Sequence, residues 1–84
     1  LQALRILLLF LYDANPELRA YAIIAIRNCK HLPSHPFAFY ICDKAMKYLF
    51  YHDPSLTVRT EAGRFLFEHI ALSDMPTFAD QLLH

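Results

Sequence analysis

Apolar residues along the chain recur at helical spacing. The pattern i, i+4, i+7, i+11, which places residues on one face of an α-helix, occurs twice at mostly apolar positions. The first set is Leu18, Ala22, Ala25 and Cys29, and the second is Val58, Ala62, Phe65 and His69, with Leu66 and Ile70 widening the stripe. Between them, one helical face is expected to group Phe37, Ile41, Met46, Tyr48 and Leu49. The pattern therefore predicts a chain built from amphipathic helices.

Prolines mark where the predicted helices begin, because proline is favoured at the first helical position, where its missing N–H costs nothing. These prolines are Pro16, Pro36, Pro54 and Pro76. The side chains of Asn15 and Asp53, each directly before a proline, can cap the free backbone N–H groups of the following turn. We predict helices over about residues 1–12, 16–30, 36–51 and 54–72, and a fifth that starts near residue 75.

The predicted fold class is all-α. The aromatic stretch at residues 37–41 has strand propensity, but no partner strand is visible and residues 43–47 continue it as a helix. The single glycine also argues against a hairpin-rich fold, because tight hairpins need residues at positive φ. Short connections make neighbouring helices antiparallel.

An internal repeat with an offset of 40 residues is the most informative feature of the sequence. Residues 13–22 align with residues 53–62, and an Asp, an aliphatic residue, an Arg and an Ala match within them. Leu9 and Phe10 also fall on Leu49 and Phe50, and Ile26 falls on Leu66. The repeated unit is a helix, a tight acidic turn and a second helix.

This unit resembles the HEAT repeat, a family of stacked helix pairs. The residues that carry the resemblance are Asp13, Leu18, Arg19 and Ala22, then Asp53, Val58, Arg59 and Ala62. It covers almost the whole chain and implies a HEAT-like or armadillo-like α-solenoid. Repeat one would span about residues 1–32, repeat two about 36–72, and the start of a third 75–84. Neither first helix carries the proline that kinks this helix in many HEAT repeats.

The resemblance also implies a role for Asp13, Arg19, Asp53 and Arg59, which we call the ladder residues. In the family, the turn Asp and second-helix Arg of successive repeats form a ladder of hydrogen bonds that fixes the stacking angle. The alternative is a substrate site made of Asp and Arg.

Composition narrows the class of function. The chain has 84 residues, 56% of them hydrophobic, and a chain this short buries only about 60–65% of its unfolded surface. Because it begins and ends inside apolar patterns, we expect neighbouring repeats of a longer stack to cover the surplus. Eight basic residues balance eight acidic ones, whereas nucleic-acid binders carry a basic excess, so we expect no direct contact with nucleic acid. The longest apolar run, residues 6–12, is too short to span a membrane.

Candidate catalytic and metal-binding groups do not form a known motif. Cys29 and His31 are two positions apart, which points them to different sides of a helix, and no second paired motif accompanies them. Cys42 has no basic cluster to activate it. Gly63 is expected to mark a close approach between helices. We therefore expect no catalytic residues, no metal and no cofactor, and two cysteines without a disulfide framework favour an intracellular protein, cytoplasmic or nuclear.

Partner binding is expected on the second helix of each pair. The outward candidates are Arg27, Asn28, Arg64, Phe67 and Glu68. Aromatic and Arg side chains dominate interface energetics, so Phe67 is a plausible anchor, although it could instead cover the next layer.

The predicted function is a protein-interaction scaffold within a larger HEAT-repeat subunit of a multiprotein complex, with other proteins and neighbouring repeats as partners. One alternative is a scaffold associated with nucleic acid, in chromosome organisation or messenger-RNA 3′-end processing, because Leu18-Arg19 and residues 43–49 loosely resemble the symplekin-like scaffolds. Another is the HEAT array of a large regulatory enzyme or transport receptor.

Overall fold

The computed structural model describes residues 2–69 and is all-helical, which confirms the predicted class. The elements are α1 (Gln2–Phe10), α2 (Pro16–Arg27), the 3₁₀ turn η1 (Leu32–Ser34), α3 (Pro36–His52) and α4 (Leu56–Glu68). Within these residues there is no strand. Residue 1, residues 70–72 of the fourth expected helix and the expected helix near residue 75 lie outside the described part.

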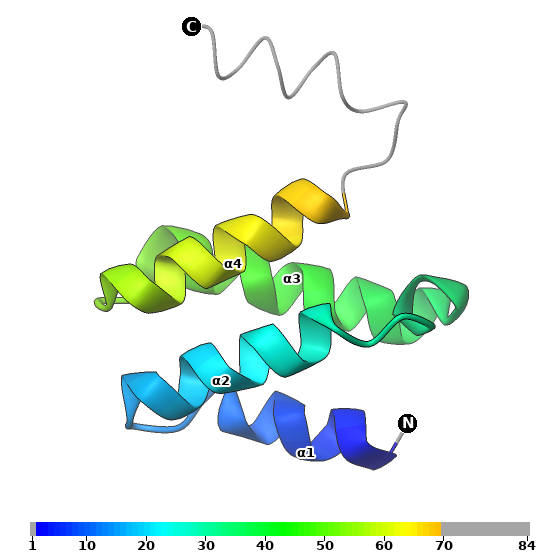
Figure 1. Cartoon of the computed structure of the whole chain (residues 1–84), viewed down its shortest axis with the longest axis horizontal. Helices are drawn as coiled ribbons and strands as arrows, with labels where there is room; N and C mark the ends of the chain where they lie inside the picture. Colours follow the sequence, from blue (N-terminus) through cyan, green and yellow to red (C-terminus); the bar gives the residue numbers. More distant parts are fainter. Residues whose placement is uncertain (1, 70–84) are drawn as a thin grey trace, which may run out of the picture.

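The helices form two antiparallel hairpins that stack on each other (Figure 1). Helix α1 packs on α2, α2 packs on α4, and α4 packs on α3. Helices α2 and α4 run in the same direction, side by side, so the second helices of the two hairpins form the seam between them (Figure 1).

The first hairpin follows the expected turn chemistry. Asn15 caps α2 by accepting a hydrogen bond on its side-chain oxygen from the N–H of Glu17, at 2.9 Å, and Pro16 is the first helical residue. However, α2 ends at Arg27, not at residue 30, because the chain turns there so that η1 can bury Leu32 completely.

The start of α4 differs from the prediction. Ser55 is the N-cap, its Oγ accepting from the N–H of Val58 at 3.3 Å, and the helix begins at Leu56, not at Pro54. Asp53 accepts instead from the N–H of Ser55 at 2.9 Å, which leaves the rest of its carboxylate for a partner from the other hairpin.

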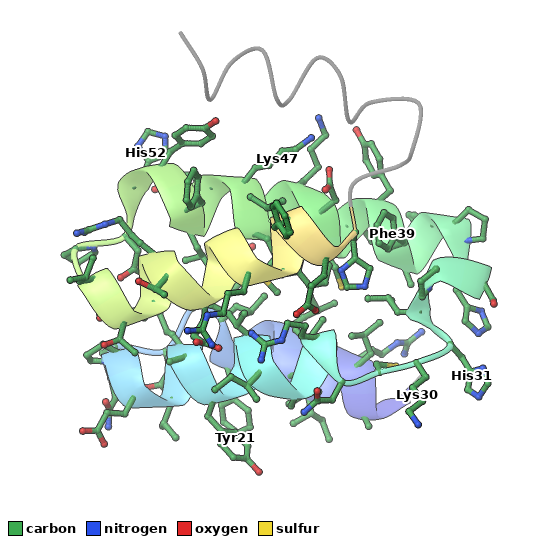
Figure 2. The ribbon with its side chains drawn as sticks, turned by 45° about the horizontal axis from the view of Figure 1, so that its top comes forward. Tyr21, Lys30, His31, Phe39, Lys47 and His52 are labelled. Carbon is green, nitrogen blue, oxygen red and sulfur yellow. The ribbon has the colours of Figure 1, made fainter. Side chains whose placement is uncertain are left out.

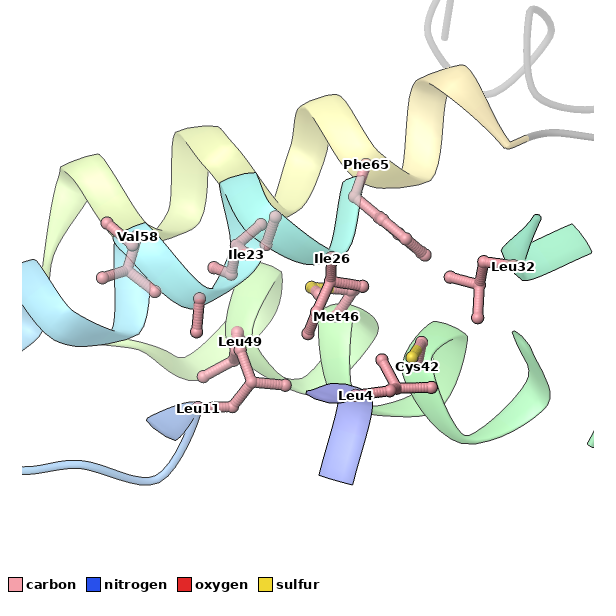
Figure 3. Close-up of a cluster of buried hydrophobic side chains, with 13 residues drawn as sticks. Leu4, Leu11, Ile23, Ile26, Leu32, Cys42, Met46, Leu49, Val58 and Phe65 are labelled. Carbon is pink, nitrogen blue, oxygen red and sulfur yellow. The ribbon is translucent and has the colours of Figure 1, made fainter. Parts of the chain in front are cut away.

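The core lies between the two hairpins, with contributions from every helix (Figure 3). Its largest fully buried side chain is that of Phe65. The core residues are Leu4, Leu11, Ala20, Ala22, Ile23, Ile26, Leu32, Cys42, Met46, Leu49, Val58, Ala62 and Phe65.

The prediction that Phe37, Ile41, Met46, Tyr48 and Leu49 share one apolar face of α3 is largely wrong. Met46 and Leu49 are buried as expected, but Phe37 is 67% exposed, Ile41 40% and Tyr48 62%. Helix α3 is apolar on two sides, and the side that contains Cys42 packs into the core while the other faces outward.

Gly63 lies where α4 approaches α3 closely, as expected. A Cβ atom at this position would lie 3.0 Å from Cε1 and 3.2 Å from Cδ1 of the Phe50 ring. The missing side chain therefore makes room for Phe50.

No helix among residues 2–69 is long and apolar enough to cross a membrane. This finding agrees with the short apolar runs in the sequence.

Candidate functional site

The turns before α2 and α4 are built alike. In each, an Asp Oδ1 accepts from the N–H two residues later, at 2.8 Å for Asp13 and 2.9 Å for Asp53. In each, an Arg on the first helical turn returns to the main-chain carbonyl of that Asp: Nη1 of Arg19 donates to the Asp13 oxygen and Nη1 of Arg59 to the Asp53 oxygen, both at 2.7 Å. The sequence repeat is therefore a repeat of local structure.

Arg19 also joins the two hairpins. Its Nε donates to Asp53 Oδ2 at 2.8 Å and its Nη2 donates to Oδ1 at 3.0 Å, a two-pronged pairing of guanidinium and carboxylate. Nη1 of the same group holds the carbonyls of Asp13 and Ala14. One side chain thus ties the turn that opens α2 to the turn that opens α4.

This bridge is largely shielded from water. The side chain of Arg19 is 11% exposed and that of Asp53 is 4% exposed. Burial alone would raise the pKa of Asp53, but the hydrogen bonds from Arg19 and the Ser55 N–H, with the positive charges of Arg19 and Arg59, outweigh it and lower that pKa below its ordinary value. Asp53 is therefore held as a carboxylate at neutral pH.

The other two ladder residues are not paired with each other. Oδ2 of Asp13 has no hydrogen-bond partner within residues 2–69, and neither do Nε and Nη2 of Arg59. These atoms are the ones that make the bridge in the Arg19–Asp53 pair. The described residues thus contain one complete Arg–Asp bridge, and the corresponding atoms of Asp13 and Arg59 make no such bridge among them.

A second polar cluster crosses the α2–α4 seam. Nη1 of Arg27 donates to Oε2 of Glu61 at 3.0 Å, and its Nε lies 3.6 Å from Oε2 of Glu68. Arg64 reaches the other oxygen of Glu61 at 3.7 Å. Three of the predicted partner-binding residues therefore meet here, around Glu61.

The predicted outward residues differ in exposure. The side chain of Arg27 is only 17% exposed, because it lies against α4 and is held there by Glu61. Asn28 is exposed as the C-cap of α2, and Phe67 is 60% exposed. Arg64 and Glu68 keep 62% and 52% of their side chains exposed, so their charged groups form the surface offered at this seam.

Glu61 is a site residue that sequence reasoning did not find. It is 9% exposed, although Tyr21 at the equivalent position of the first repeat is 67% exposed. Figure 2 shows Tyr21 pointing from α2 away from α4. The available signal was the spacing between Arg27 and Glu61, which equals the spacing between Arg19 and Asp53 at 34 residues.

Two other reactive side chains, those of Cys42 and His69, are engaged in packing. Burial, with a smaller contribution from Cys29, raises the pKa of the Cys42 thiol from 9.0 to about 11. The His69 ring stacks on Phe65, with its Nδ1 2.9 Å from the Phe65 carbonyl oxygen. No group of three His, Cys, Asp or Glu residues suited to a metal ion gathers anywhere in residues 2–69.

Comparison of this chain with models of known protein families, with curated proteins and with solved structures finds no match.

Proposed function

We propose that the chain is a segment of a HEAT-like α-solenoid and acts as a protein-interaction scaffold. The Arg19–Asp53 bridge carries the proposal, because it joins two turns of the same construction across the stack. The same bridge, repeated between successive helix pairs, would build an extended assembly. Such assemblies present long surfaces to partner proteins.

Exposure at equivalent positions supports a stack that is longer on the side of the first hairpin. Val58 and Phe65 on α4 are completely buried against the first hairpin and the core. Their equivalents on α2, Leu18 and Ala25, are 40% exposed and half-buried. The positions that α4 buries against the first hairpin are therefore partly exposed on α2, where a preceding helix pair could cover them.

The opposite side shows the same contrast. Ala20 is buried on α2, whereas its equivalent Thr60 on α4 is exposed, and Leu11 is 1% exposed whereas Tyr51 is 71% exposed. The Nε and Nη2 donors of Arg59, which have no partner among residues 2–69, lie on the same side. This face therefore matches the face of the first hairpin on which the second hairpin packs. We propose that a further helix pair covers it.

The surface proposed for partner proteins is the α2–α4 seam at Arg64 and Glu68, together with Phe67 on the same helix α4. It combines a ring that is 60% exposed with charged groups already positioned by Arg27 and Glu61. Aromatic and Arg residues in such surroundings are typical of interface hot spots.

Site-specific photo-cross-linking in the cells that produce the protein tests this proposal. A photoreactive amino acid replaces Arg64 in one variant and the exposed Arg5 of α1 in a matched control. We expect discrete protein adducts from position 64 that are absent from position 5 and that disappear with Phe67→Ala. Identical adducts from both positions would contradict the proposed surface, and cross-linked RNA in place of protein would favour the nucleic-acid alternative.

A further inference from the structure

An open groove of about 510 Å³ lies beside α3, where α1 ends and the chain turns toward α2. Its floor includes Leu11 and Leu49, which are 1% and 5% exposed and belong to the core. Its rim carries three phenol groups, those of Tyr12, Tyr40 and Tyr48, with exposures of 75%, 59% and 62%. The groove is therefore apolar at its base and ringed by side chains that can both pack and form hydrogen bonds.

Lys44 gives this groove its charge. It is the charged residue among those that line the groove, and its Nζ lies 5.3 Å from the centre of the Tyr40 ring. In the part of the chain that the structure describes, no carboxylate lies within ion-pair distance of Lys44. Its neighbour Lys47 differs, since it is paired with Asp43 at 2.9 Å.

The complementary occupant carries a negative charge next to an apolar side chain. An ammonium group and three phenols at the rim can all donate hydrogen bonds to a carboxylate. The volume accommodates one or two large side chains, which would bury the floor around Leu11 and Leu49. A peptide segment with a large apolar residue flanked by Asp or Glu supplies both features on one short chain.

Other polyanions fit less well. Stable attachment to an anionic membrane takes several basic residues or an inserted apolar chain. Here a single lysine, Lys44, lines a concave surface, and it has no ion-pair partner in the described part of the chain. Single-stranded RNA would stack on the tyrosines, but such binding also needs a positively charged track along the backbone, and the chain has a net charge of zero.

We propose that the groove between the end of α1 and α3 is a docking site for an acidic, apolar peptide segment of a partner protein. The apolar side chain lies on Leu11 and Leu49, and a carboxylate of the peptide binds Lys44 and the neighbouring phenols. This inference extends the proposed scaffold function to a surface separate from the α2–α4 seam.

The test is fluorescence anisotropy with the 84-residue chain and a labelled peptide whose centre is Glu-Glu-Leu-Phe-Glu-Glu. A charge-reversed peptide has Lys in place of each Glu. We expect the acidic peptide to bind and the charge-reversed peptide not to bind. Lys44→Glu should lower the affinity for the acidic peptide by at least about tenfold. The matched control Lys30→Glu makes the same charge change at an exposed residue outside the groove and should leave the affinity unchanged.

Two tyrosine variants and two alternative ligands complete the test. Tyr40→Ala and Tyr48→Ala, both at exposed positions, should lower the affinity for the acidic peptide while preserving the circular dichroism spectrum. The proposal is overturned if the acidic peptide does not bind up to about 1 mM, if Lys44→Glu binds it as well as the unmodified chain, or if phosphatidylserine vesicles or oligouridylate bind and the peptide does not. Because the cross-linking at position 64 examines the α2–α4 seam, each proposal can fail without the other.

Discussion

Removal of one partner of the Arg19–Asp53 bridge should cost far more stability than removal of one partner of an exposed ion pair. With Arg19 11% exposed and Asp53 4% exposed at the side chain, removal of one partner leaves a charge in a poorly hydrated place, which typically costs about 3–5 kcal/mol. Domains of this size have a total stability of about 4–13 kcal/mol. Arg19→Met alone should therefore remove a large share of the free energy of unfolding.

A double-mutant cycle isolates the pairwise contribution. Asp53→Asn preserves the shape of the side chain and an acceptor for the Ser55 N–H, so we expect a coupling energy between Arg19→Met and Asp53→Asn of about 2 kcal/mol. The matched control is the cycle of Asp43→Asn and Lys47→Met, whose charged groups lie 2.9 Å apart in the unmodified chain but whose Lys47 side chain is 54% exposed. That pair should couple by about 0.3–0.5 kcal/mol.

The assay is urea unfolding followed by circular dichroism at pH 7, with a protecting osmolyte added to all samples if a single variant is partly unfolded. Equal coupling energies in the two cycles would refute the reasoning, because they would show that shielding from water does not strengthen the Arg19–Asp53 bridge.

Three other measurements examine separate features. Because the pKa of folded Asp53 lies below its ordinary 3.8, its contribution to stability is complete above that value and is lost as the pH falls through the lower folded pKa; urea midpoints should drop in this range, and Asp53→Asn should flatten the drop. Cys42, fully buried with its pKa raised to about 11, should react with Ellman's reagent at pH 8 only after urea unfolding, whereas the partly exposed Cys29 should react in the folded chain; equal native rates would contradict this. Gly63→Ala should stabilise α4 by up to about 1 kcal/mol when it is added to a Phe50→Leu chain, and by less in the unmodified chain, because the new Cβ would lie 3.0 Å from the Phe50 ring. Thermal melts of the four chains measure both effects, and equal effects in the two backgrounds would contradict the close approach.

The sequence predicted the helices well because their signals are local. The side chain of Asn15 and the ring of Pro16 act within one turn, so the start of α2 follows from neighbouring residues. The same reasoning was wrong for Asp53, because the turn before α4 has the construction of the turn before α2, in which the N-cap comes two residues after the Asp. Ser55 corresponds to Asn15 and caps α4, whereas Asp53, like Asp13, accepts from the N–H two residues later.

The outward face of α3 shows a different limit of periodicity. Two faces of this helix are apolar, one with Cys42 and Met46 and one with Phe37, Ile41 and Tyr48, and spacing alone does not say which of them is buried. Tertiary packing selects the face that fits against α4 and the first hairpin. The sequence pattern therefore did not reveal the candidate groove, because Ile41 and Tyr48, which line it, were grouped with the buried Met46 and Leu49.

The two polar bridges across the seam have a consequence for the register of the helices. Arg19 with Asp53 and Arg27 with Glu61 are both separated by 34 residues, so the two bridges form together at one alignment of α2 with α4. Sliding α4 by one helical turn, four residues, would place the two guanidinium groups opposite Thr57 and Phe65 in one direction, and Arg27 opposite Thr57 in the other. Apolar side chains can repack after such a slip, but these charges would lose both partners at once. The two bridges thus fix the register of α4 against α2 among the packing arrangements that the apolar core alone would accept.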